Sequence, residues 1–130
     1  MITTISVPAA PGEILDKLTI LDIKSERISD EIKLANIRLE QDLLNQIVKQ
    51  DIPASPHLSA LIKTLKTINE ELWDIEDDIR DCERNKNFDD QFVKLARAVY
   101  HTNDKRCDVK REINQYLGSQ IIEEKSYQAY

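Results

Sequence analysis

The chain of 130 residues contains few glycines, prolines and aromatic residues. There are two glycines, four prolines, one tryptophan, four tyrosines and two phenylalanines. A β-sandwich or β-barrel needs turn-forming residues every few positions, so this scarcity excludes both classes. The two cysteines are too few for a disulfide framework, and we expect free thiols in a cytoplasmic protein.

Long apolar runs and an excess of positive charge are also missing. No stretch approaches the roughly 18 apolar residues of a membrane span. The first residues, MITTISVPAAPGE, lack the basic and apolar segments of a secretion signal. The 18 basic and 24 acidic residues give a net charge of −6, which argues against nucleic acids and anionic membranes as partners. We therefore expect a single acidic domain over residues 1–130.

Breaks in the sequence separate three long periodic segments. They predict helices over about 12–50, 56–84 and 88–117, with an irregular arm over 1–11 and a C-terminal tail over 118–130. Ser55 before Pro56 is typical of a helix N-cap followed by proline at the first helical position. Asn87 is the expected cap of the third helix, and Gly118 is the expected C-cap glycine.

Apolar residues recur at alternating intervals of three and four in each segment. Such heptad spacing buries one side of each helix against its neighbours, and the short loops favour an antiparallel three-helix bundle. The seams are Ile14, Leu18, Leu21, Ser25, Ile28, Ile32, Ala35 and Leu39 in the first segment; Leu58, Leu61, Leu65, Ile68, Leu72, Ile75, Ile79 and Cys82 in the second; and Phe88, Phe92, Leu95, Val99, Thr102, Arg106, Val109, Ile113 and Tyr116 in the third.

The first segment carries a second apolar stripe on nearly the opposite side. A helix that is apolar on two sides is buried on two sides, so we expect a homodimer in which a partner chain covers the spare stripe. The alternative is that the N-terminal arm or the tail covers it. The residues of this second stripe are Ile20, Ile23, Leu34, Ile37, Leu44 and Val48.

Both stripes of the first segment are interrupted by polar residues at one level. Folding the second helix back along the first brings this level near the end of the second helix. An ion-pair network of Arg27, Asp30, Asp77 and Arg80 is predicted there. We interpret it as structural, because buried polar groups fix helix register and ion-pair networks arise without being functional sites.

The third helix carries cations on its inward side. Arg106 occupies a seam position beside Asn103 and Lys110, and buried cations require counter-charges. One hypothesis is internal pairing, with Glu40, Glu70, Glu123 and Glu124 as the candidate carboxylates. The functional hypothesis is a small anionic ligand, a phosphate or carboxylate, bound by Arg38, Arg106 and Lys110 and oriented by Asn103.

Two short patterns of charged residues partly resemble motifs of known enzymes. Glu71 and Asp74 resemble the E-x-x-D element of all-α nucleotide pyrophosphohydrolases, which would imply a divalent metal. The second E-x-x-E element of that family is missing, so we predict no metal site and no cofactor. The long first helix with Glu26 and Arg27 resembles the all-helical chorismate mutases in geometry only, and the arginine expected at its start falls at Ala10.

Four longer motifs together resemble a bacterial family of short proteins of unknown function. They are PGEILDKLTILDIKSERI from Pro11, LWDIEDDIR from Leu72, LARAVY with the following NDKR from Leu95, and GS with EEKSY from Gly118. The resemblance covers the chain from Pro11 to Tyr127. Because no activity is established for such a family, the resemblance implies no catalytic residue.

The sequence therefore favours a non-catalytic helical protein that acts as a homodimer, through interaction or by binding a small anion. No complete catalytic constellation is present. The alternative is an enzyme acting on a phosphorylated or carboxylated metabolite, with Arg38, Arg106 and Lys110 binding the anion and a magnesium-dependent, pyrophosphohydrolase-like reaction as one form of it.

Overall fold

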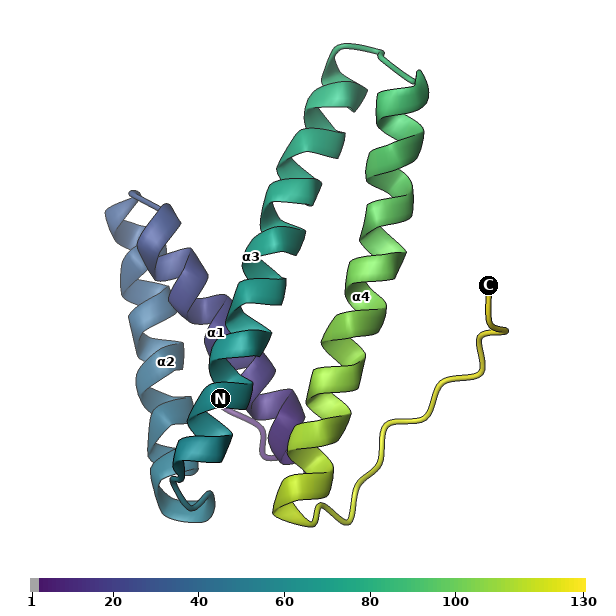
Figure 1. The fold of residues 1–130 in the computed structure, drawn as a ribbon. Helices are drawn as coiled ribbons and strands as arrows, with labels where there is room; N and C mark the ends of the chain where they lie inside the picture. Colours follow the sequence, from purple (N-terminus) through teal and green to yellow (C-terminus); the bar gives the residue numbers. More distant parts are fainter. Residues whose placement is uncertain (1–2) are drawn as a thin grey trace.

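The computed structural model describes residues 3–130, which form four α-helices joined by short turns. The helices are α1 (Pro11–Arg27), α2 (Glu31–Asp51), α3 (Pro56–Arg84) and α4 (Asp90–Leu117), shown in Figure 1. No strand occurs among these residues, which confirms the all-helical class. None of the four helices is long and apolar enough to cross a membrane. Of the predicted N-terminal arm, residues 1–2 lie outside the described range.

The predicted continuous helix over 12–50 is wrong, because the chain breaks between α1 and α2. Ile28 is extended, with φ −92° and ψ 133°. The Asp30 side chain then accepts a hydrogen bond from the backbone N–H of Lys33 at 2.9 Å and caps α2. A cap of this kind satisfies a backbone donor that a helix start leaves free. The polar residues of this level therefore end one helix and begin the next.

The other helix ends agree more closely with the predictions. Helix α3 covers the predicted residues, and Ser55 Oγ accepts from the Leu58 N–H at 3.1 Å as its N-cap. Gly118 ends α4 in the left-handed region with φ 67°, as expected of a C-cap glycine. Helix α4 begins two residues later than predicted, because Asp89 rather than Asn87 is its N-cap.

Helix α1 lies at the centre of the arrangement. Helices α3 and α4 form an antiparallel pair, α1 packs against both of them, and α2 packs along the other side of α1 (Figure 1). Among helix pairs, α2 approaches only α1 closely. The predicted three-helix bundle is thus replaced by a three-helix core of α1, α3 and α4 with α2 added to its outside.

Two clusters of buried apolar side chains meet at α1. One lies between α1, α3 and α4, and the other lies between α1 and α2, so α1 contributes leucines to both. The first cluster consists of Leu15, Leu58, Leu61, Leu65 and Ile113, and the second consists of Leu18, Leu21, Leu34 and Ile37. Helix α1 is thus buried on two sides: Leu18 and Leu21 of the predicted seam pack against α2, and Ile23 of the second stripe is 1% exposed.

Helix α2 keeps only one of its two apolar stripes inside. Leu34 and Ile37 are buried against α1, whereas Ile32 and Leu39 of the predicted seam are 76% and 61% exposed. The break at Ile28 changes the side of the helix that faces the protein. The spare stripe predicted from the sequence is therefore present in α2, but it is the opposite stripe from the one expected.

A close backbone contact fixes the start of α1 against the end of α4. The Gly12 N–H donates to Asn114 Oδ1 at 2.7 Å, and both residues are buried. A Cβ atom at position 12 would lie 2.7 Å from the backbone oxygen of Lys110 and 2.8 Å from Asn114 Oδ1. Only glycine permits this approach without a shift of backbone.

We predict that Gly12→Ala lowers the free energy of unfolding by about 1–3 kcal/mol, because the added methyl group overlaps a backbone oxygen. Urea denaturation followed by circular dichroism measures the change. Gly118→Asn is the matched control, since asparagine tolerates the left-handed conformation and nothing lies within 4 Å of a Cβ there. A Gly12→Ala protein as stable as the wild type would contradict the close contact.

Candidate functional site

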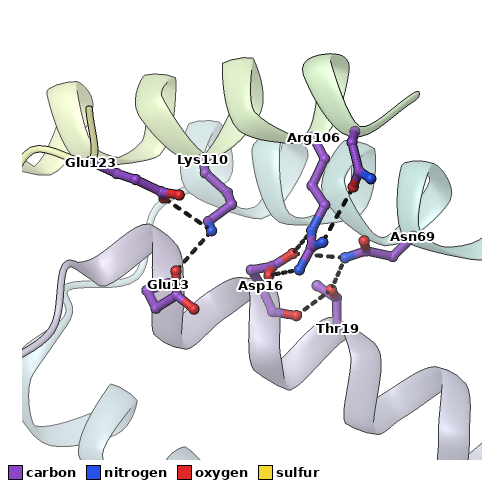
Figure 2. A network of polar contacts seen from close by, with 8 residues as sticks. Glu13, Asp16, Thr19, Asn69, Arg106, Lys110 and Glu123 are labelled. Carbon is purple, nitrogen blue, oxygen red and sulfur yellow. Dashed lines mark hydrogen bonds and ion pairs between the residues drawn. The ribbon is translucent and has the colours of Figure 1, made fainter. Parts of the chain in front are cut away.

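A buried carboxylate on α1 holds an arginine of α4. Asp16 is 1% exposed and receives two hydrogen bonds from the Arg106 guanidinium. Nε of Arg106 donates to Oδ1 at 3.0 Å, and Nη2 donates to Oδ2 at 2.5 Å, so the contact is bidentate. Figure 2 shows the two side chains reaching toward each other from the two helices. Paired hydrogen bonds of this geometry are the strongest form of ion pair.

A third helix completes the surroundings of the carboxylate. The Asn69 amide of α3 donates to Asp16 Oδ1 at 2.9 Å and to Thr19 Oγ1 at 2.8 Å. Thr19 in turn donates to the Asp16 carbonyl at 2.7 Å (Figure 2). Within residues 3–130, no buried side-chain nitrogen or oxygen is left without a partner. The network therefore satisfies its members internally and joins α1, α3 and α4 at one point.

Hydrogen bonding to Asp16 raises the pKa of Arg106 above its ordinary value, although burial acts in the opposite direction. The arginine is consequently charged at any pH at which the protein folds. Its charge is already neutralised by the carboxylate of Asp16, and its remaining Nη1 lies 3.5 Å from Asn103 Oδ1. This geometry gives Arg106 a structural role between α1 and α4.

The second inward cation, Lys110, is also held by carboxylates of the protein. Its Nζ lies 2.8 Å from Glu13 of α1 and 3.2 Å from Glu123 of the tail (Figure 2). Burial alone would lower the pKa of Lys110, but the hydrogen bonds with both glutamates outweigh that effect and raise the pKa above 10.5. Internal pairing with Glu123 was one of the two hypotheses from the sequence, whereas the part of Glu13 was not foreseen.

We predict that Asp16→Asn lowers the free energy of unfolding by about 3 kcal/mol, because it leaves the Arg106 guanidinium without its counter-charge. Chemical denaturation gives the value. The matched control is Asp74→Asn, which removes the partner of Arg27 in an exposed ion pair and should cost less than about 1 kcal/mol. Equal costs for the two variants would show that the buried pair has no special weight.

We predict that alkali weakens the fold partly through Lys110. Because the pKa of Lys110 is higher in the folded chain, its contribution is complete below pH 10.5 and is lost as the pH rises through the folded-state value. Between about pH 9 and about pH 11.5 the wild type should therefore lose more unfolding free energy than Lys110→Met. Parallel denaturation curves at the two pH values test this, and an equal loss in both proteins would refute it.

The four predicted anion-binding residues do not gather at one place. Arg106, Lys110 and Asn103 lie along α4, but Arg38 is exposed on α2, which does not approach α4. Arg106 and Lys110 face Asp16, Glu13 and Glu123 as described above. Binding of a small anion therefore stays a prediction, and the contacts that such an anion would use are occupied by carboxylates of the chain.

The residues of the predicted ion-pair network have other partners. Arg27 binds Asp74 at 2.5 Å, Arg80 binds Glu76 at 2.8 Å, and Asp30 caps α2. Asp77 and Arg80 line a shallow groove of about 420 Å³ between α1, α3 and α4, together with Asn103 and Arg106. Helix α1 ends at Arg27, so Asp30 belongs to the start of α2 instead, and the fourfold network does not form.

The acidic pair Glu71 and Asp74 does not form a metal site with other residues. Glu71 is exposed, and Asp74 is bound to Arg27. Over residues 3–130, no three histidine, cysteine, aspartate or glutamate side chains are grouped so that they could hold a metal ion. Nothing in this region therefore adds to the likeness with the pyrophosphohydrolases.

Sequence reasoning missed the residues of α1 that build the network. Gly12, Asp16, Thr19 and Ile23 are all buried and follow at intervals of four, three and four. This spacing places them on one side of the helix, facing α3 and α4. This spacing is visible in the sequence. It does not form an apolar seam, because three of the four residues are not apolar.

These features define an all-helical protein in which a buried polar network joins the N-terminal helix to the helical pair. The chain belongs to a family of unknown function, DUF6165, whose model matches residues 5–130. This match confirms the resemblance to a family of unknown function. No curated protein and no solved structure matches the chain.

Proposed function

We propose that this protein acts without catalysis, by association, and that it forms a homodimer through the outer side of α2. The observation that carries the proposal is the apolar stripe there. Its four large residues, Ile32, Leu39, Leu43 and Ile47, are between 43% and 76% exposed. A row of exposed leucine and isoleucine side chains along one helix is costly in water, and such patches mark interaction surfaces.

The spacing of the stripe supports a helical partner. Ile32, Leu39 and Leu43 follow at intervals of seven and four, which places them along one line of the helix. Leu34, Ile37, Leu44 and Val48 contact α1 from the opposite side. A second helix laid along the outer line would bury α2 on both sides, as its two-sided pattern requires.

The polar network supports the non-catalytic part of the proposal. Its cations are bound by carboxylates of the same chain, and its buried donors and acceptors have partners among themselves. A reactive site needs at least one group that is free to act on a substrate. The Asp16–Arg106 contact supplies rigidity instead.

Light scattering at micromolar concentration tests the association. We predict that the wild type has the mass of a dimer and that Leu39→Lys is a monomer, because a charge placed in the seam would be buried without a partner. Leu39 is exposed in the single chain, so the variant should keep its helices, which a circular dichroism spectrum equal to that of the wild type would show.

Val93→Lys is the matched control, since Val93 is 52% exposed on α4 and lies away from the proposed surface. It should remain a dimer. A monomeric wild type over the whole micromolar range would overturn the proposal. So would a Leu39→Lys protein that still dimerises while Val93→Lys dissociates, because the interface would then lie on the helical pair.

A further inference from the structure

A line of four charged side chains runs beside the exposed stripe of α2. Glu31, Arg38, Asp42 and Lys49 follow at intervals of seven, four and seven residues. Seven, eleven and eighteen residues are each close to a whole number of helical turns, so the four side chains share one flank of the stripe. All four are exposed, and none enters an ion pair within residues 3–130.

The signs of these charges reverse about the middle of the helix. Arg38 and Asp42 lie two residues to either side of position 40, and Glu31 and Lys49 lie nine residues to either side. Each acid is thus matched by a base at the same distance in the other direction. A two-fold axis through position 40 would place every acid of the line opposite a base of a second copy.

The apolar stripe is centred within about one residue of the same position. Under the same axis Ile32 comes within one residue of Ile47 of the partner subunit, and Leu39 lies within one turn of Leu43 of the partner subunit. All four large exposed residues of the stripe are then covered by one another. The apolar stripe is therefore compatible with the register of the charged line.

The orientation follows from which flanks meet. In an antiparallel pair the charged line faces the same line of the second copy. In a parallel pair it would face the other flank, which carries Lys33 and Glu40. Glu40 is already bound to Lys17 of α1 at 2.8 Å, so that flank has less charge to offer. The line of Glu31, Arg38, Asp42 and Lys49 is complementary to the same line of a second copy.

We propose that two copies of this chain pair antiparallel along α2 and cross at position 40. Glu31 binds Lys49 of the partner subunit, and Arg38 binds Asp42 of the partner subunit, each twice by symmetry. The proposal rests on the association described under the proposed function and adds its partner, polarity and register. The stripe supplies apolar burial, and the charged line selects the direction.

Two single variants test the register when they are mixed. E31K and K49E each turn two attractive contacts of the homodimer into two repulsive ones, and each should weaken self-association about tenfold at low salt. In the mixed dimer, the base introduced at position 31 faces the acid introduced at position 49, while the native Glu31 and Lys49 of the two chains also pair. Sedimentation equilibrium should therefore show the equimolar mixture restored to nearly wild-type association.

Within one chain, positions 31 and 49 are about 27 Å apart along the helix, so recovery in the mixture can arise only between chains. K33E is the matched control on the other flank of the same helix and should change the dissociation constant by less than about twofold. Circular dichroism of each variant verifies that the helices are intact, and high salt should reduce the differences.

The outcomes test the association, the register and the polarity separately. A wild type that is monomeric overturns the proposed association, and the antiparallel pairing with it. A wild-type dimer whose E31K and K49E variants do not recover on mixing overturns the antiparallel register alone. A dimer that K33E weakens as strongly as E31K, and that mixing E31K with K49E does not restore, overturns the polarity and points to a parallel pair.

Discussion

A carboxylate as fully buried as that of Asp16 must be neutralised where it stands, because an isolated charge inside a protein costs far more than a fold can supply. Arg106 meets this need from α4, and Asn69 supplies one more hydrogen bond from α3. The network thereby joins three helices at one buried point. An apolar contact tolerates sliding by part of a turn, but a bidentate ion pair does not.

The central position of α1 determines what α2 can bury. One side of α1 carries the polar network and packs in the Leu15 cluster. The other side of α1 packs against Leu34 and Ile37 of α2. Since α2 approaches no other helix closely, the side of α2 away from α1 has no neighbour within the described chain. The exposed stripe therefore lies on the side of α2 that faces away from the core of α1, α3 and α4.

The helices of the pair could be predicted because local signals determine them. Ser55 with Pro56 and the left-handed Gly118 act through neighbouring backbone groups, and both stand where they were expected. The break between α1 and α2 was missed, because the apolar spacing continues across it and conceals the cap at Asp30. Heptad spacing reports which residues are apolar, but it does not report where a helix turns back.

Of the polar network, the sequence predicts the cations but not the carboxylates of α1 that bind them. Arg106 and Lys110 stood out as cations in an apolar seam, which is a local anomaly. Their partners Asp16 and Glu13 are 90 and 97 residues away along the chain, and an acid on a helix with many acids is no anomaly. Long-range pairing depends on how helices cross, which the folded structure alone determines.

The outer side of α2 combines an apolar stripe with a line of charges, and the two differ in what they can specify. Apolar residues alone would let two copies of α2 meet in either direction and in several registers, because burial has no direction. Charges differ in this respect, since a like pair across an interface is unfavourable and a displaced register exposes it. A row of alternating charges with opposite signs about its centre is complementary to itself in one direction only. Glu31, Arg38, Asp42 and Lys49 have that order. The sequence of one helix can therefore specify both the partner and the polarity of an association.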